Sequence, residues 1–284
     1  MTIAVTGAGG HLGRLVVEAL LRDGVTGVIA VVRDPRKVAD LAARGVEIRQ
    51  ADYGDAAALD RALAGVDRVL LISGSEMGAR IAQHTNVIRA AERAGVSLLA
   101  YTSIPKALEN PLLLAQEHRG TEEVLANSTV PHAILRNSWY WENYTGGLAH
   151  VVETGVLPGA AGSGRVAGAA RADYADAAAK VLTTEGHAGR VYELGGDERL
   201  THAEIAAQIS RAAGKEVRYQ DLSQADYQAG LRAAGIPDGY AEVLADADYR
   251  IRTGILDVDS GDLQKLLGRP STPAVEVFRA ALAE

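Results

Sequence analysis

The chain has 284 residues, 48% of them hydrophobic, which is enough for one large α/β domain or for one domain with a smaller lobe. Its formal net charge of −7 disfavours a general surface for nucleic acids or anionic membranes, because such binding depends on excess Lys and Arg. The absence of cysteine excludes disulfides, thiolate metal sites, iron–sulfur clusters and a cysteine nucleophile.

The chain opens with the pattern of a strand, a glycine turn and a helix. Residues 3–5 are apolar and run into Thr6-Gly-Ala-Gly-Gly-His-Leu-Gly13, after which apolar residues recur at helical spacing. In such a turn Gly7 allows the tight bend, Gly10 lets the backbone approach a pyrophosphate, and Gly13 lets the helix pack on the sheet. The helix N-terminus then faces the anion. The pattern predicts a dinucleotide site, and an ordinary glycine-rich turn is the alternative.

A second strand, residues 28–32, ends at Arg33, about 20 residues after the last glycine of the turn, where the cofactor is selected. An acidic residue here would accept hydrogen bonds from the ribose hydroxyls of NAD. A guanidinium instead matches the geometry of the additional phosphate of NADP. The sequence therefore favours NADPH over NADH, and a solvated arginine at a strand end is the alternative.

Further strands and helices alternate along the first 135 residues, which is typical of a doubly wound parallel sheet with right-handed crossovers. Asp52 is a candidate acceptor for the adenine amine, and Asp55 is expected to cap the next helix. Ligands of such sheets bind beyond the carboxyl ends of the strands, where Gly7, Arg33, Ser73 and Thr102 are expected. The expected strands are 46–51, 68–72, 96–101 and 132–136, and the expected helices are 56–64 and 81–94.

The remaining chain predicts a smaller, mainly helical lobe. Thr201 to Glu204 has the pattern of a capping box at a helix start. We expect an NADP-binding domain over residues 1–138 plus about 166–196, and a substrate-side lobe over about 139–165 and 197–284. The expected elements are short strands and loops at 155–168, helices at 171–184, 201–213, 224–234, 237–249 and 273–283, and strands at 190–194 and 216–220.

Short motifs spread along the chain carry a resemblance to a known family. They lie at residues 6–13, 32–35, 49–55, 71–73, 100–103, 135–137, 139–140, 142–144, 171–174 and 191–194. Together they resemble the NmrA-like group of atypical short-chain dehydrogenases/reductases over nearly the full length. Within that group the chain is similar to the NAD(P)H-dependent quinone reductases first and to the triphenylmethane reductases next. One departure is Gly9, where the group often has threonine.

The resemblance implies an NADPH site and a Rossmann fold. The residues that it assigns to the cofactor are Gly7, Ala8, Gly9, Gly10, His11 and Leu12 at the pyrophosphate, Arg33 at the 2′-phosphate, Ser73, Gly74 and Ser75 along the nucleotide, Asn137, Ser138, Trp139, Tyr140, Trp141 and Glu142 on the nicotinamide side, and Arg171.

Most short-chain dehydrogenases use a Tyr-x-x-x-Lys pair, and none of the ten tyrosines here is followed by lysine four residues later. Reduction of a simple ketone forms a strongly basic alkoxide, so a positioned acid contributes about 10²- to 10⁴-fold. Reduction of a quinone forms a phenolate-like oxygen of pKa roughly 10, which water can protonate. We therefore expect direct hydride transfer from NADPH to a quinone or a similarly conjugated acceptor, without flavin or metal.

Candidate residues for the acceptor pocket come from an unusual concentration of aromatic and amide side chains. Tyr140, Asn143 and Tyr144 are the expected walls and hydrogen-bond donors, with Ser75 and Tyr101 as alternatives. Packing between the domains is the other explanation for these aromatic residues. No catalytic residue is assigned.

Several alternatives stay open. A structural or solvated role suits His118 better than that of a catalytic base. Reduction of other conjugated acceptors such as triphenylmethane dyes is the alternative activity, and a non-catalytic NADP sensor that binds a regulatory partner is the alternative of another class. No leader or apolar run of membrane-spanning length is apparent, so we expect a soluble, cytoplasmic protein, and a homodimer is one assembly that stays open.

Overall fold

The computed structural model describes residues 1–283, which divide into two compact units. The first comprises residues 1–104, 117–137 and 171–192, and the second comprises 105–116, 138–170 and the described chain from 193 onward. Residues 105–116 thus group with the second unit, although the sequence suggested that the smaller lobe begins near residue 139.

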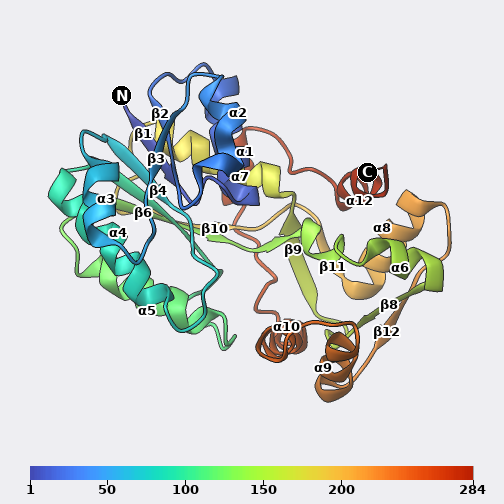
Figure 1. The fold of residues 1–284 in the computed structure, drawn as a ribbon. Helices are drawn as coiled ribbons and strands as arrows, with labels where there is room; N and C mark the ends of the chain where they lie inside the picture. Colours follow the sequence, from blue (N-terminus) through green and yellow to red (C-terminus); the bar gives the residue numbers. More distant parts are fainter. Residues whose placement is uncertain (284) are drawn as a thin grey trace. The chain divides into compact units, whose positions relative to one another are not determined.

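A seven-stranded sheet forms the centre of the first unit, with the order β10-β6-β5-β4-β1-β2-β3 (Figure 1). The neighbouring strands from β3 through β6 pair in parallel, which confirms the doubly wound parallel sheet expected from the sequence. The strands are β1 (Ile3–Thr6), β2 (Val28–Val32), β3 (Glu47–Gln50), β4 (Arg68–Leu71), β5 (Leu98–Ser103), β6 (His132–Asn137) and β10 (Val191–Leu194).

Helices cover both faces of this sheet, with α1 and α7 on one face and α3, α4 and α5 on the other (Figure 1). All five residues of β2 are buried, as expected for a continuous apolar strand covered on both faces. Small alanine side chains on the buried face of α7 allow it to pack closely on α1. The helices are α1 (His11–Arg22), η1 (Pro35–Val38), α2 (Ala39–Ala42), α3 (Ala56–Leu63), α4 (Arg80–Ala94), α5 (Ala115–Ala126) and α7 (Arg171–Thr183).

The fifth strand starts and ends two residues later than the sequence pattern suggested. Helix α4 ends in a left-handed Gly95 with φ 68°, and the N–H of Val96 still bonds to the carbonyl of Ala91. The strand therefore begins only at Leu98, and Thr102 lies inside the strand instead of after it. The expected cap is confirmed, because the Asp55 carboxylate accepts the N–H of Ala58 at 2.9 Å.

The second unit is mainly helical, as expected, with two small sheets of order β11-β9-β7 and β12-β8. Two helices, α6 and α11, were not expected from the sequence. Its elements are β7 (Trp139–Tyr140), η2 (Trp141–Tyr144), α6 (Leu148–Thr154), β8 (Val156–Gly159), β9 (Arg165–Ala169), β11 (Arg199–Thr201), α8 (His202–Ala213), β12 (Arg218–Asp221), α9 (Gln224–Ala233), α10 (Asp238–Ile251), α11 (Asp262–Leu267) and α12 (Ala274–Ala283).

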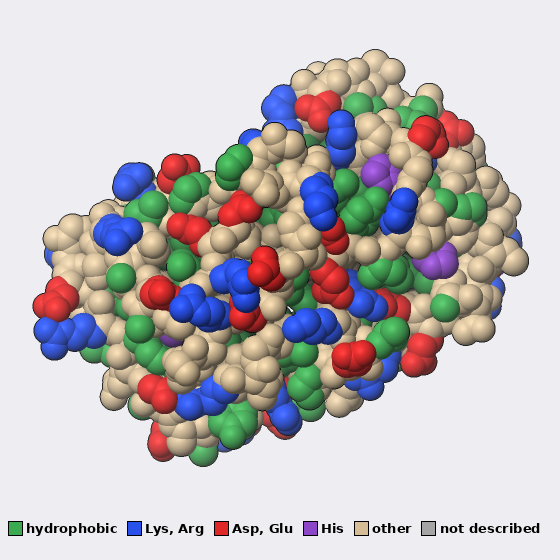
Figure 2. Space-filling view, turned by 180° about the vertical axis from the view of Figure 1, so that it is seen from behind, with side chains coloured by type: hydrophobic (Ala, Val, Ile, Leu, Met, Phe, Trp, Pro, Cys, Tyr) green, Lys and Arg blue, Asp and Glu red, His purple; other side chains and the backbone are tan. Residues whose placement is uncertain are grey.

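Charged side chains of both signs are interspersed on the face of the molecule drawn in Figure 2. Among the described residues, no helix combines the length and the apolar character that crossing a membrane requires.

Candidate functional site

The glycine turn between β1 and α1 is a cradle that side chains would fill. Gly7 has a φ of +63°, which favours glycine, and its carbonyl accepts the N–H of Gly10 at 2.9 Å. A Cβ on Gly13 would lie 2.7 Å from the Cα of Ala8, so helix and turn approach too closely for any side chain. Gly10 supplies no side-chain cap, and the first turn of α1 contains no acidic residue. The first N–H groups of α1 therefore suit an anion.

Arg33 lies at the same edge of the sheet as this turn. It follows β2, Gly7 follows β1 and Ser73 follows β4, and these three strands are neighbours. The exposed guanidinium of Arg33 reaches the segment after β4, where its Nη1 lies 2.6 Å from Oε1 of Glu76. Its Nε lies 4.0 Å from a carboxylate oxygen of Asp52. A phosphate that approaches Arg33 would therefore compete with the carboxylate of Glu76.

Side chains of the first unit hold the segment Ser73–Ser75 in place. The N–H of Ser73 donates to the hydroxyl of Thr102 at 2.9 Å, and that of Gly74 donates to Nε2 of His84 at 2.9 Å. The carbonyl of Gly74 accepts a hydrogen bond from Nε of Arg80 at 2.7 Å. Ser75 is exposed. The backbone of this segment is thus fixed from behind, while Ser75 faces solvent.

The bonds of His84 settle its protonation. Because Nε2 accepts from the backbone N–H of Gly74, the ring proton is on Nδ1, which lies 2.9 Å from the hydroxyl of Thr121. Burial, and then the nearby charge of Arg80, lower the pKa of His84 to about 3. His84 is therefore neutral at neutral pH and acts as an acceptor for the backbone.

Tyr101 belongs to the core of the first unit. Its side chain is fully buried among apolar residues of the sheet and its helices, and its hydroxyl lies 2.8 Å from Nδ1 of His118. Burial raises the pKa of Tyr101 and lowers that of His118 to about 3. This arrangement supports a structural role for His118, and it makes Tyr101 a poor candidate for lining a pocket.

Two further candidates of the first unit lie at element ends. Asn137 is buried at the end of β6, and Arg171 is half-buried at the start of α7. The candidates from Ser138 to Tyr144 belong to the second unit, so the residues assigned to the cofactor by resemblance come from both units.

The aromatic stretch of the second unit starts with β7. Trp139 and Tyr140 are half-buried and pair with Gly168 and Ala169 of β9. Trp141 is fully buried against Gly168, where a Cβ would lie 2.6 Å from its ring. Its indole N–H has no hydrogen-bond partner within residues 1–283. Buried donors are normally paired, so this one is a candidate contact for a bound group.

Ser138, Glu142 and Asn143 differ in exposure. Ser138 is buried, and its N–H donates to the carbonyl of Leu194 at 2.9 Å. Glu142 is half-buried and Asn143 is exposed in η2.

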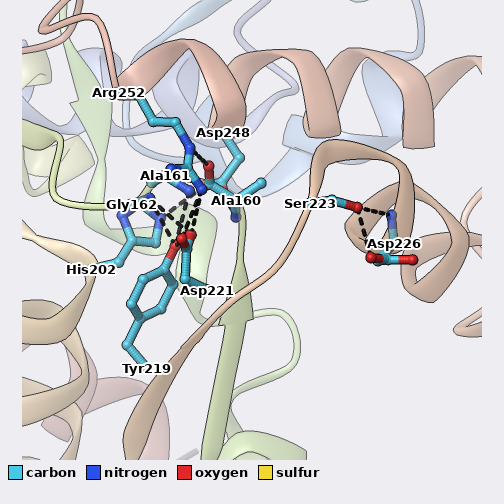
Figure 3. A network of polar contacts seen from close by, with 10 residues as sticks. All are labelled: Ala160, Ala161, Gly162, His202, Tyr219, Asp221, Ser223, Asp226, Asp248 and Arg252. Carbon is cyan, nitrogen blue, oxygen red and sulfur yellow. Dashed lines mark hydrogen bonds and ion pairs between the residues drawn. The ribbon is translucent and has the colours of Figure 1, made fainter.

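Tyr144 ends η2 and faces a histidine that the sequence analysis missed. Its half-buried ring stands edge-on to the ring of His202, with centroids 5.5 Å apart. His202 is 1% exposed, and its Nε2 lies 2.8 Å from Oδ1 of Asp248 in α10. The other oxygen of this carboxylate accepts the N–H of Ala160. Figure 3 shows Asp248 and His202 beside the backbone of Ala160–Gly162.

Two features of the sequence point to His202 and Asp248. The capping box is confirmed: the hydroxyl of Thr201 accepts the N–H of Glu204 at 3.2 Å, which places His202 at the first position of α8. Asp248 follows the buried Ala241 and Ala245 at helical spacing, so it is an acidic residue on an apolar face. What the sequence did not show is that these two helices meet.

The glycine cradle, the guanidinium at the neighbouring strand end and the fixed segment after β4 fit a phosphorylated dinucleotide. The comparisons with known proteins agree. The chain matches the model of the NmrA-like family over residues 1–252. It is 50% identical over 275 residues to quinone oxidoreductase 2 of Escherichia coli, with 96% of each chain covered.

Solved structures of similar proteins also match nearly the whole chain. The NADPH-dependent quinone oxidoreductase of Escherichia coli in complex with NADPH matches with a TM-score of 0.95 and 49% identity, over 100% of both chains. The triphenylmethane reductase of Citrobacter sp. in complex with NADP(H) matches with a TM-score of 0.94 and 39% identity, over 99% of this chain and 100% of that one. The chain belongs to the NmrA-like family.

Proposed function

We propose that this protein is an NADPH-dependent oxidoreductase that reduces a quinone directly. The observation that carries the proposal is the edge of the first unit's sheet, where the Gly7 cradle and the guanidinium of Arg33 follow adjacent strands. The extensive similarity to NADPH-dependent quinone oxidoreductase, whose structure contains NADPH, supports both the cofactor and the acceptor.

In this proposal the chain's own groups bind and orient the nucleotide. The N–H groups at the start of α1 hold the pyrophosphate, and Arg33 exchanges Glu76 for the 2′-phosphate. His84 and Arg80 fix the backbone of Gly74, which borders the nucleotide. When bound, NADPH supplies the hydride.

The acceptor must be one that needs no strong acid from the protein. No tyrosine of the sequence is followed by a lysine at the fourth position, and His118 is neutral and held by Tyr101. A quinone meets this requirement, because its reduced oxygen has a pKa near that of tyrosine, roughly 10, and takes a proton from water.

The two units have different roles in this proposal. The first unit binds the nucleotide, and the second unit contacts the acceptor through Tyr140, Asn143 or Tyr144. The enzyme uses neither flavin nor metal, acts on a small molecule in the cytoplasm and forms a homodimer.

The second candidate function is reduction of cationic triphenylmethane dyes. It is favoured by the 39% identity to a triphenylmethane reductase whose fold matches with a TM-score of 0.94. A dye cation becomes neutral when it accepts hydride, so it also requires no acid.

The test is a panel of quinones, triphenylmethane dyes and simple ketones, assayed with NADPH and with NADH at one enzyme concentration. We expect multiple turnovers of quinones with NADPH, slower turnover with NADH and no reduction of ketones. Faster reduction of dyes than of every quinone would support the second candidate. Tight NADPH binding without turnover of any acceptor would contradict both and support a sensor.

A further inference from the structure

The hydroxyl of Tyr144 has an unusual set of partners within the second unit. The indole of Trp139 contributes a hydrogen bond to it, and an indole N–H can only donate. Its second polar neighbour is Nε2 of His202, at 3.5 Å. The phenol's own proton therefore needs an acceptor other than the indole.

Asp248 determines which ring nitrogen of His202 carries the proton. One carboxylate oxygen already accepts the N–H of Ala160, and the other lies 2.8 Å from Nε2 of His202. An ionised carboxylate only accepts hydrogen bonds, so Nε2 carries the ring proton and directs it towards Asp248. Nε2 then has no lone pair for Tyr144. The remaining ring nitrogen, Nδ1, is buried and has no hydrogen-bond partner in residues 1–283.

Neither neighbour of the Tyr144 oxygen therefore offers a lone pair, and the contacts described for residues 1–283 provide no acceptor for its proton. Burial, and then the charge of Asp248, raise the pKa of Tyr144 well above its ordinary value. The phenol consequently keeps its proton throughout the neutral range. A half-buried, neutral donor of this kind is suited to a ligand oxygen.

We propose that Tyr144 donates a hydrogen bond to the acceptor's oxygen, where negative charge develops, and that His202, fixed by Asp248, is a positioning residue for it. This inference rests on the proposed quinone reduction and specifies its substrate class, an acceptor with a carbonyl oxygen. The reaction consumes quinone, NADPH and one proton and yields hydroquinone and NADP⁺. The proton comes from water, and Tyr144 retains its own.

Tyr219 provides a matched control from the same cluster. Its ring also packs on His202, with centroids 5.3 Å apart. Its hydroxyl, however, donates to Asp221 at 2.8 Å and accepts the N–H of Ala161 at 2.9 Å, so protein groups use its proton and its oxygen (Figure 3).

The experiment compares Tyr144→Phe and Tyr219→Phe by the ratio of kcat/KM for a benzoquinone to kcat/KM for a cationic triphenylmethane dye, both with NADPH. The dye carries no oxygen at its reacting centre. We expect Tyr144→Phe to lower the ratio about 10- to 100-fold, since donors to developing oxyanions have effects of this order or larger. Tyr219→Phe is expected to change the ratio less than twofold while lowering thermal stability.

His202 is tested by the same ratio with two substitutions. His202→Leu should lower the ratio at least threefold, whereas His202→Gln, whose amide nitrogen stands near the position of Nε2, should restore most of it. Because both substrates are measured on one preparation, the ratio does not depend on the fraction of protein that folds. Recovery by glutamine separates positioning of Tyr144 from simple packing.

The outcomes separate the inference from the proposed function. If the wild-type protein reduces quinones and Tyr144→Phe leaves the ratio unchanged, the role of Tyr144 is overturned while the function stands. Equal ratios for His202→Leu and the wild type would overturn the positioning role. If the wild-type protein reduces no quinone with NADPH, the proposed function fails, and the inference fails with it.

Discussion

The two units each bury a histidine beside a tyrosine, but the two clusters use their protons differently. In the first unit, Tyr101 bonds to His118, and both ring nitrogens of His84 bond to protein groups. In the second unit, Nε2 of His202 directs its proton to Asp248, and the proton of Tyr144 has no acceptor among residues 1–283. Paired groups of this kind support a fold, whereas an unpaired proton is available to a ligand.

The two clusters and the glycine edge therefore have different tasks, which substitutions can test. Changes in the first cluster should alter stability, and changes at the glycine edge should alter nucleotide affinity. Neither should alter the choice between acceptors.

The largest expected effect is the loss of stability of the protein in acid. The folded pKa values of His84 and His118, about 3, lie below the unfolded value of about 6.5, so the unfolded chain binds more protons between these limits. The contribution of these two histidines to stability is thus present above about pH 6.5 and is lost as the pH decreases. From pH 7 to pH 5 each histidine should cost about 2 kcal/mol, measured by urea unfolding.

The substitution His84→Gln isolates one of these two contributions. It should reduce the difference in unfolding free energy between pH 7 and pH 5 by about 2 kcal/mol, and His118→Gln should reduce it by a similar amount. An unchanged difference in both variants would show that these histidines are not buried in the neutral form.

The next effect concerns cofactor choice at the glycine edge. Arg33→Asp replaces a phosphate-binding guanidinium by a carboxylate beside Glu76 and Asp52, so we expect NADPH to bind about 100-fold more weakly, a loss of about 2.7 kcal/mol. NADH binding should change less than threefold. Arg36→Asp is the control, since Arg36 pairs with Asp34. Equal losses for both nucleotides would refute the role of Arg33.

A smaller effect is expected for Tyr101→Phe. Removal of the hydroxyl leaves Nδ1 of His118 without its partner, so unfolding free energy should fall by about 1 kcal/mol in a thermal or urea melt. Quinone turnover should stay within about tenfold of the wild type, because no side-chain acid is required. A collapse of turnover in the folded variant would contradict the argument about the proton.

The smallest effect is expected for Glu76→Gln. Nη1 of Arg33 lies 2.6 Å from the Glu76 carboxylate, which competes with the 2′-phosphate. Because exposed ion pairs contribute at most about 1 kcal/mol, we expect NADPH to bind about two- to fivefold more tightly in titration calorimetry, with NADH unaffected. Glu47→Gln removes the carboxylate that pairs with Arg49 and is the control. Weaker NADPH binding in Glu76→Gln would contradict the competition.

The doubly wound sheet and the glycine cradle follow from patterns along the chain. The signals are local: the motif from Thr6 to Gly13 fits within one strand-to-helix turn, and Arg33 follows the next strand. The carboxyl ends of neighbouring parallel strands lie at the same edge of a sheet. The positions of the glycine turn and of Arg33 along the chain therefore predict that both lie at that edge. The missing Tyr-x-x-x-Lys pattern was equally visible, because it is defined by spacing alone.

Which aromatic and histidine side chains are structural depends on how distant elements pack in the fold. Tyr101 follows the pattern of a pocket residue in sequence, yet its hydroxyl lies inside the first unit's core. The pair of His202 and Asp248 joins helices that begin 36 residues apart, at 202 and 238, and its effect on Tyr144 depends on which nitrogen carries one proton. Such contacts arise when distant helices pack together, and no spacing rule along the chain encodes them.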